Sequence, residues 1–253
     1  MKPSFFLEEM TRVDANDASN ALVIWPIGAI EQHGPHLPVG TDTIIARHLA
    51  KQTAIEIGNK IPTVVAPTLP FGSSDHHLPF GGTMSLSTQL FYQIVFEIGE
   101  SLIKSGFKLI YLLNSHGGNH ELLQLVSRDL ALKHPVSIAS ASYWNVAWDD
   151  LIDNNAHVNK RLPGHAGSFE TSIILSLNPE LVKEPIPSRA SFLSSDPKSF
   201  SRPVRVEHHG SWLKIDGYSD SPQNAEGSNG DEWLKVIVRA LSKSMIQFYK
   251  DSK

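Results

Sequence analysis

A twelve-residue stretch, EQHGPHLPVGTD, follows closely on the apolar run ALVIWPIG and contains two carboxylates and two imidazoles. Glu31 and His33 are two residues apart, so in an extended segment both side chains point to the same side. The glycine and prolines after them predict an irregular turn that brings Asp42 back toward this pair. Side chains of these types ionise or bind metal ions, and here they stand where a buried strand is predicted to end.

Two further stretches place similar groups at predicted strand ends. His116 lies in NSHGGNH, directly after the apolar run FKLIYLL. His165 lies in GHAGSFET and precedes a predicted helix that carries Glu170. Because ligand sites of open parallel sheets gather outside the carboxyl ends of the strands, we expect the three clusters to meet at one site.

Each cluster also has a simpler explanation when it is taken alone. A single histidine at a strand end is more often a hydrogen-bonded turn residue, and Glu170 could cap its own helix. NSHGGN could be a glycine turn or a phosphate-binding loop at a helix N-terminus. Independent turns do not predict that all three clusters fall at one sheet edge, so a functional site is favoured. The histidine pairs at 76–77 and 208–209 are predicted as loop residues, with His76 or His77 lining the pocket.

Two carboxylates and two imidazoles from different strands are enough to hold two divalent ions if one carboxylate bridges them. Two ions about 3.5–4 Å apart bind hydroxide between them at neutral pH and polarise a carbonyl oxygen. This chemistry predicts the hydrolysis of an amide-type bond. The chain has no cysteine, so the ligands are nitrogen and oxygen atoms, a set that admits zinc, manganese or iron.

The elements that position these residues follow an alternation of apolar runs and segments of helical period. Buried strands are predicted at 21–28, 61–71, 107–114 and 135–142, with prolines interrupting the second. Helices are predicted at 42–58, after a cap at Ser87 or Thr88, around 122–130, at 167–177 and from 234 to 248. This order predicts an α/β fold of three layers, αβα, in which helices cover both faces of a mostly parallel central sheet.

The composition fits one domain over residues 1–253, with an irregular Pro- and Ser-rich elaboration at about 183–230. A net charge of −4 without a basic stripe gives no footprint for nucleic acid, so a small-molecule partner is expected. No apolar stretch approaches the roughly 20 residues that span a bilayer, and the N-terminus carries no cleavage pattern. We therefore expect a cytoplasmic protein with no membrane partner.

Three motifs together resemble the creatininase (creatinine amidohydrolase) family. They are EQHGPHLPVGTD, the Asn-x-His-Gly-Gly-Asn stretch and GHAGSFETS, in this order and at similar spacing. The resemblance extends from about Ala21 to Leu177. It implies an α/β fold with a parallel sheet, a binuclear metal centre, hydrolysis of a carbon–nitrogen bond outside ordinary peptides, and a homo-oligomer, often a hexamer.

The resemblance also implies roles for individual residues. Glu31 and His33 each resemble a ligand of one metal ion, and Asp42 resembles the bridging carboxylate. His116 resembles the remaining imidazole on the ion that Glu31 binds. His165 resembles the catalytic histidine.

Departures from the family pattern bear on the substrate. Creatininase itself has His-Tyr-Glu where this chain has His116, Gly117 and Gly118, and that glutamate is a ligand of the second metal ion. The missing carboxylate is assigned to Glu170, which resembles the glutamate of His-Ala-Gly-x-x-Glu-Thr in the His-Gly-Gly-Asn branch of the family.

A second departure lies beside the catalytic histidine. Creatininase has an acidic residue directly before it and a tryptophan a few residues earlier, where this chain has Gly164 and Arg161. Both departures argue against creatinine as the substrate. Relatives in the same broad family open formamide bonds of pyrimidine precursors or trim a short modified peptide.

His36, Asn119 and Trp144 are predicted to bind the substrate, and Trp148 is a further candidate for the pocket wall. The alternative from a different functional class is a non-catalytic α/β protein. In that case SHGGN binds an anion or a nucleotide and the acidic residues are structural.

Overall fold

Four apolar segments form a parallel sheet in the computed structural model, which describes residues 4–156, 162–188 and 208–253. The strands are β1 (Leu22–Ile27), β2 (Thr63–Val65), β3 (Leu109–Asn114) and β4 (Ser137–Ser142). They lie in the order β2-β1-β3-β4, and every pair of neighbours is parallel. The predicted parallel α/β sheet is therefore confirmed.

The helices of the described residues alternate with these strands, as predicted. In chain order the α-helices are α1 (Arg12–Asp17), α2 (Thr41–Ile57), α3 (Thr88–Lys104), α4 (His120–Lys133), α5 (Tyr143–Val146), α6 (Trp148–Asp153), α7 (Ser168–Leu177), α8 (Ser211–Lys214) and α9 (Gly227–Asp251). Short 3-10 helices are η1 (Leu7–Glu9), η2 (Asp75–Phe80), η3 (Gly117–Asn119), η4 (Pro179–Leu181) and η6 (Pro222–Asn224). Ser87 caps α3, because its hydroxyl oxygen accepts a hydrogen bond from the Leu90 N–H.

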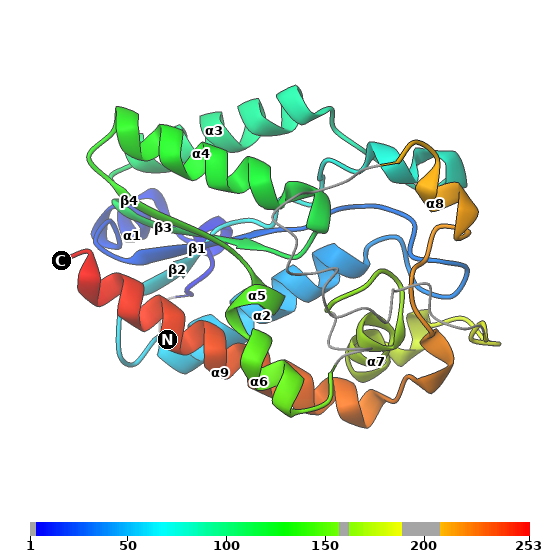
Figure 1. Ribbon diagram of the computed structural model, residues 1–253. Coiled ribbons are helices and arrows are strands. Elements are labelled where there is room, and N and C mark those ends of the chain that lie inside the picture. The colour runs from blue at the N-terminus through cyan, green and yellow to red at the C-terminus, as the bar shows by residue number, and fades with distance from the viewer. Residues whose placement is uncertain (1–3, 157–161, 189–207) are drawn as a thin grey trace.

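Helices cover both faces of the sheet, which confirms the three-layer arrangement (Figure 1). Because successive strand residues point to opposite faces, Leu22 and Ile24 enter one core cluster and Val23 and Trp25 enter the other. The first cluster contains residues of α2, α7 and α9, and the second contains residues of α3 and α4. A strand buried on both faces needs a continuous apolar sequence, which is what LVIWPI supplies.

The second strand is shorter than predicted. Only Thr63–Val65 of the segment 61–71 pairs as a strand, because prolines lack the N–H that a ladder requires. Beyond it the chain still follows β1, since the N–H groups of Ala66 and Leu69 donate to the carbonyls of Ile24 and Pro26.

The predicted elaboration at 183–230 is described only in part. Its central residues, 189–207, lie outside the described residues. The described remainder contains α8, η6 and the start of α9, which begins at Gly227, earlier than predicted. Within the described residues, no helix is both long and apolar enough to cross a membrane.

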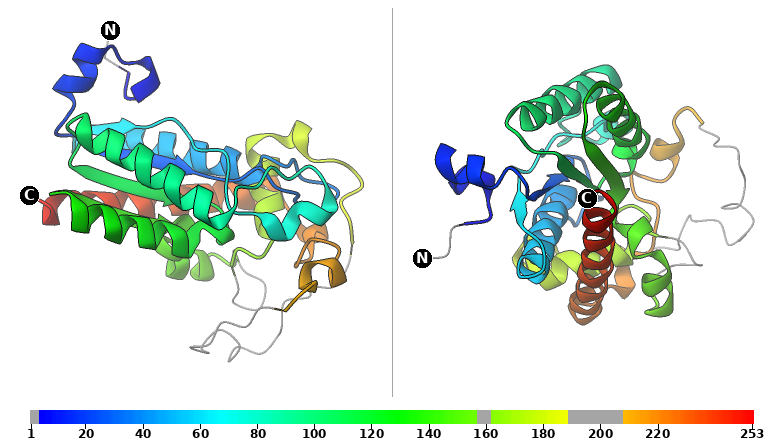
Figure 2. Two further views of the ribbon diagram at one scale, coloured as in Figure 1. Left: turned by 90° about the horizontal axis from the view of Figure 1, so that it is seen from above. Right: turned by 90° about the vertical axis from the view of Figure 1, so that its left-hand side faces the viewer.

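The strand order creates a switch point beside β1. The chain passes from β1 to β2 on one side and then to β3 on the other, so the connections diverge at the carboxyl ends of β1 and β3. Ligand sites of open α/β sheets lie at such a point. The register of β1 and β3 pairs Ile27 with Asn114, so these two strands end at the same level. Figures 1 and 2 show α7 and α8 at this end, away from the C-terminus.

Candidate metal centre

The predicted ligands converge from two strand ends and two helix starts. They are Glu31 and His33 after β1, Asp42 in the first turn of α2, His116 after β3 and Glu170 in the first turn of α7. All five side chains are buried. The Ser115 hydroxyl donates to the carbonyl of Asp42 at 2.7 Å, which ties the start of α2 to the end of β3.

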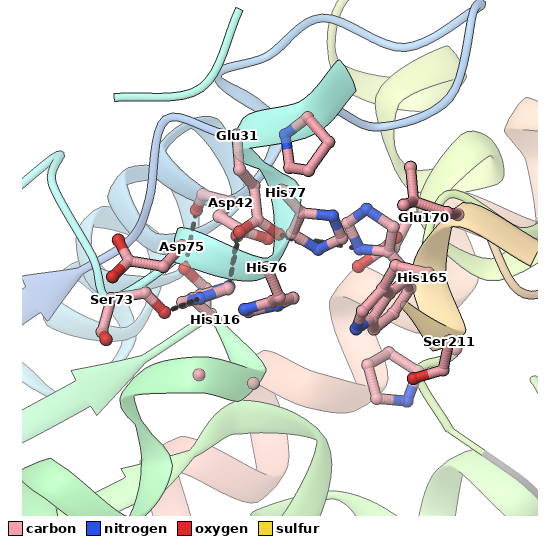
Figure 3. A pocket seen from close by; sticks show the side chains of 18 of the residues that line it. Glu31, Asp42, Ser73, Asp75, His76, His77, His116, His165, Glu170 and Ser211 are labelled. Atoms are coloured by element: carbon pink, nitrogen blue, oxygen red, sulfur yellow. Dashed lines mark hydrogen bonds and ion pairs between the residues drawn. The ribbon is translucent and has the colours of Figure 1, made fainter. Parts of the chain in front are cut away.

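Glu31, Asp42 and His116 form a first triad of candidate ligand atoms. His116 Nδ1 lies 3.2 Å from Glu31 Oε2 and 3.2 Å from Asp42 Oδ2. One ligand atom from each of the three lies within 4.8 Å of the others. Figure 3 shows these three side chains pointing toward one another.

His33, Asp42 and Glu170 form a second triad within the same limit. His33 Nε2 lies 3.4 Å from Asp42 Oδ1 and 4.0 Å from Glu170 Oε2. Asp42 belongs to both triads and turns a different oxygen toward each histidine, Oδ1 to His33 and Oδ2 to His116. This is the geometry that a carboxylate bridging two ions requires.

Outer hydrogen bonds determine which ring nitrogen faces the site. His33 Nδ1 donates to the carbonyl oxygen of Glu31 at 3.0 Å, and His116 Nε2 donates to that of Ser73 at 3.1 Å. Because a carbonyl oxygen only accepts, the neutral rings are left with bare Nε2 on His33 and bare Nδ1 on His116. Both bare nitrogens face Asp42.

Three of the candidate ligand atoms are buried without a hydrogen-bond partner: Glu31 Oε2, His33 Nε2 and Asp42 Oδ2. Leaving a buried polar group unsatisfied costs about 1–3 kcal/mol, and more when it is charged. A cation satisfies such atoms. Imidazole nitrogen with carboxylate oxygen suits zinc, manganese or iron, so the residues fit two divalent ions that share Asp42.

Without a cation, protons compensate these buried charges. Burial disfavours the charged form of His33, but Asp42, Glu170 and Glu31 outweigh it and raise the pKa to about 10. Burial also disfavours the charged form of His116, but Glu31 and Asp42 outweigh it and hold the pKa of His116 well above its usual value. Burial raises the pKa of Glu170 to about 8. The site therefore retains protons in the places that metal ions would fill.

His165 lies beside the two triads. Its Nε2 donates to the carbonyl oxygen of Gln32 at 2.8 Å, and its Nδ1 lies 3.6 Å from Glu31 Oε1. Its main-chain N–H donates to the Ser219 hydroxyl at 2.9 Å, and the turn begins at Gly164, whose φ is +71°. Burial, with a further contribution from His33, lowers the pKa of His165 well below its usual value. A neutral ring with a bare Nδ1 can accept a proton and return it.

A cavity of about 920 Å³ opens over these groups. Glu31, Asp42, His116, His165 and Glu170 all line it, and Figure 3 shows these side chains around it. Trp144, predicted to bind the substrate, also lines the cavity, whereas Trp148 packs against the hydrophobic core.

The other two predicted substrate-binding residues do not line the cavity. The Asn119 amide donates to the carbonyl of Gly28 at 3.0 Å and accepts from the Ser73 N–H at 3.0 Å. It therefore holds two loops together behind the cavity. His36 is buried, with its Nε2 2.8 Å from the Thr171 hydroxyl, and burial lowers its pKa to about 4.

Residues of two other segments also line the cavity, as predicted for His76 or His77. His76 and His77, from η2, line the cavity, and His77 is buried with its ring stacked on His165. His208, His209 and Trp212 also line it, and the first two lie outside helices and strands, as predicted. The carboxyl end of β2 leads to η2, so the strand-end rule also accounts for the position of His77. No signal in the sequence pointed to Trp212.

A family model described as creatininase, creatinine amidohydrolase, matches residues 8–245. The chain belongs to the creatininase family. The mycofactocin precursor peptide peptidase of Mycolicibacterium smegmatis is 33% identical over 161 residues, 63% of this chain and 59% of that protein. The creatinine amidohydrolase of Pseudomonas putida is 29% identical over 205 residues, 72% of this chain and 75% of that protein.

The chain matches less than two thirds of the length of these peptidases. The matched region spans only 59–60% of the length of the four mycofactocin peptidases. A crystal structure of creatinine amidohydrolase (creatininase) has a TM-score of 0.80 and 24% identity, and the match covers 96% of this chain and 97% of that one. This likeness shows the creatininase-like fold. Other structures of that enzyme are described as "Creatininase Mn" and as "Zn-Zn type".

The surroundings of Gly118 explain one departure of this family member from creatininase. A Cβ atom added there would lie 2.3 Å from the Ser73 carbonyl oxygen and 2.6 Å from His116 Nε2. Any side chain would therefore disturb the hydrogen bond that orients His116, and no carboxylate fits at this position. In the second triad Glu170 supplies the carboxylate other than the shared Asp42.

Proposed function

We propose that this protein is a dinuclear metal-dependent amidohydrolase that cleaves a carbon–nitrogen bond outside ordinary peptides. The observation that carries the proposal is the pair of buried triads that share Asp42 and contain three unsatisfied ligand atoms. Glu31, Asp42 and His116 would hold one ion, and His33, Asp42 and Glu170 the other. Zinc, manganese and iron all suit these donors.

When bound, two such ions supply hydroxide at neutral pH and polarise a carbonyl oxygen. The chain's own contribution to bond cleavage is the transfer of a proton by His165. Its bare Nδ1, 3.6 Å from Glu31 Oε1, would accept the proton that remains on the attacking hydroxide and return it to the departing nitrogen. That return is necessary because an amide anion is too poor a leaving group to depart without a proton.

The shape of the cavity supports a substrate bulkier than creatinine. Its volume of about 920 Å³ is near the upper end of ligand pockets, which span about 300–1,000 Å³. Gly117 lines it, and a Cβ atom added there would meet nothing within 4 Å. Space is thus left beside His116, where creatininase has a tyrosine. We place the protein in the His-Gly-Gly-Asn branch and favour a formamide or cyclic amide carried by a larger group.

Trimming of a short modified peptide is the second candidate within the same chemistry. It is supported by the 33% identity to a mycofactocin precursor peptide peptidase and by the open space at Gly117. The non-catalytic alternative, an anion-binding protein, is less well supported. Three buried carboxylates, Glu31, Asp42 and Glu170, face the cavity that an anion would have to enter.

The predicted homo-oligomer, in the form of a hexamer, stays a prediction, and light scattering on the purified protein tests it. A single domain over residues 1–253 and a cytoplasmic location also stay predictions.

Elemental analysis combined with a substrate screen tests the proposed function. We expect about two equivalents of divalent ion per chain and release of ammonia, amine or formate from formamides, cyclic amides, creatinine or short peptides. Matched assays of chelator-treated protein should show no release. A folded protein that binds no divalent ion but binds nucleotides would favour the non-catalytic alternative.

A further inference from the structure

His77 is a second buried imidazole beside Glu31, and the proposed metal ligation and proton transfer do not use it. Its Nε2 lies 3.7 Å from Glu31 Oε1, the same oxygen that His165 Nδ1 approaches to 3.6 Å. The rings of His77 and His165 are stacked, with centroids 4.3 Å apart and planes 16° apart. Figure 3 shows the two labelled side chains next to one another over the site.

The side chain of Gln32 determines the proton position on His77. Its Oε1 accepts from the Gly34 N–H at 2.9 Å, and its Nε2 donates to the Gly217 carbonyl at 2.6 Å. Because a main-chain N–H only donates and a carbonyl only accepts, these two contacts settle the orientation of the amide. The Gln32 NH₂ group lies 2.7 Å from His77 Nδ1, so this nitrogen accepts.

It follows that neutral His77 carries its hydrogen on Nε2, the atom that faces the cavity. His165 has the same tautomer but the opposite orientation, because its Nε2–H donates to the Gln32 carbonyl and its bare Nδ1 faces the cavity. Gln32 thus holds a hydrogen-bond donor, His77 Nε2–H, beside a hydrogen-bond acceptor, His165 Nδ1. A hydrogen on Nε2 also makes His77 unsuited as a metal ligand through that atom.

We propose that His77 contacts the substrate as a neutral N–H donor to the carbonyl oxygen at which negative charge develops, and that Gln32 is the positioning residue that holds His77 in this tautomer. The proposal rests on the proposed function, because it assigns a further group to that reaction. No proton leaves His77. It stabilises charge on oxygen, whereas His165 moves the proton to the departing nitrogen.

The tautomer of His77 is measurable without a substrate. Nitrogen NMR of protein labelled with ¹⁵N-histidine and loaded with zinc separates protonated from bare ring nitrogens, and loss of the signals in His77→Gln assigns them. We expect a protonated Nε2 and a bare Nδ1. In Gln32→Glu, a carboxylate that only accepts should move the hydrogen to Nδ1. A bare Nε2 on His77 in the unaltered protein would overturn the proposal whether or not the Gln32 variant folds.

The donor role is tested with acetohydroxamate, a chelating probe whose charged oxygen stands for the developing oxyanion. Calorimetry on zinc-loaded protein should show affinity about ten- to a hundredfold weaker in His77→Leu, as expected for a lost hydrogen bond to a charged group. His77→Gln is the matched control, since its amide keeps an N–H near the Nε2 position, and it should bind within about threefold of the unaltered protein.

The outcomes separate the two proposals. Both variants should keep two zinc ions, and loss of zinc from both would make His77 a ligand and overturn the inference. Equal affinity of His77→Leu and unaltered protein for acetohydroxamate, with two ions retained, would refute the donor role alone. If the unaltered protein takes up neither zinc nor manganese nor iron, the proposed function fails instead, while the NMR measurement still reports on Gln32 and His77.

Discussion

Replacing Asp42 with asparagine tests the shared carboxylate directly. The substitution keeps the shape of the side chain, and the Ser115 hydroxyl still reaches the main-chain carbonyl of residue 42. It removes one of the two oxygens that face His33 and His116, together with the charge that offsets the repulsion between two cations. A carboxamide coordinates through one oxygen, so it cannot bridge. We expect Asp42→Asn to retain at most one ion.

The size of the effect on stability follows from binding linkage. A free metal concentration of 100 times the dissociation constant adds about 2.7 kcal/mol per site, so two independent sites add about 5 kcal/mol. For a chain of 253 residues, about 2–4 °C per kcal/mol gives a rise in Tm of roughly 10–20 °C on metal addition. The rise in Asp42→Asn should be less than half as large.

The assay combines elemental analysis with thermal unfolding before and after addition of zinc or manganese. Asp75→Asn is the matched control, because Asp75 lines the same cavity but is exposed and accepts a hydrogen bond from the Ser85 hydroxyl. It should keep two ions and the full rise in Tm. Two ions and an unchanged rise in Asp42→Asn would refute a bridging role for Asp42.

Four further predictions follow from the same geometry. His165→Gln should keep both ions and lower turnover by roughly 10² to 10⁴, measured on one preparation, and loss of the metal would make His165 a ligand. Glu170→Gln should lower occupancy of the ion at His33 with little change in the Tm of the metal-free protein, whereas unchanged metal content with a lower metal-free Tm would make Glu170 a helix cap. Gly118→Ala should destabilise the protein by about 1–3 kcal/mol and weaken metal binding. In Gly117→Ala the added Cβ meets no atom within 4 Å, so stability should change by less than about 0.5 kcal/mol. Denaturant titrations of both variants check these values. In metal-free protein the folded pKa of His33 is about 10 against a reference of 6.5, and that of Glu170 is about 8 against 4.5. The folded state therefore binds more protons than the unfolded state between pH 6.5 and 8. The free energy of unfolding should fall over this range by up to about 1.4 kcal/mol per pH unit for each group. Denaturant titrations across that range check the sign, and stability that rises with pH would contradict it.

The sheet was predictable because its two central strands are continuous apolar runs buried on both faces. Alternation with helical segments then indicated parallel pairing. The length of β2 was not predictable from apolar content, because the prolines at 62, 67 and 70 interrupt pairing while the chain continues beside β1. Residue propensity indicates that a segment can form a strand. The length of that strand depends on which main-chain N–H groups have hydrogen-bond acceptors in the neighbouring strand.

The candidate ligands were predictable where they are close in sequence. Glu31, His33 and Asp42 lie within twelve residues, so one short motif reveals three groups. Trp212 could not be found in this way, because it approaches His77 and His165 only through the tertiary fold. Asn119 shows what sequence proximity leaves out: it was predicted to bind substrate, and in the fold its amide joins two loops.

Gln32 lies between two proposed ligands, Glu31 and His33, and its contacts determine the proton positions on two other histidines. Its main-chain carbonyl accepts from His165, and its side-chain amide donates to His77. Any shift of this segment that moves a metal ligand therefore also moves the groups that would exchange a proton with the substrate or donate a hydrogen bond to it. Metal binding should consequently restrict the His77 and His165 rings together, because a single extended segment positions both the ligands and their neighbours.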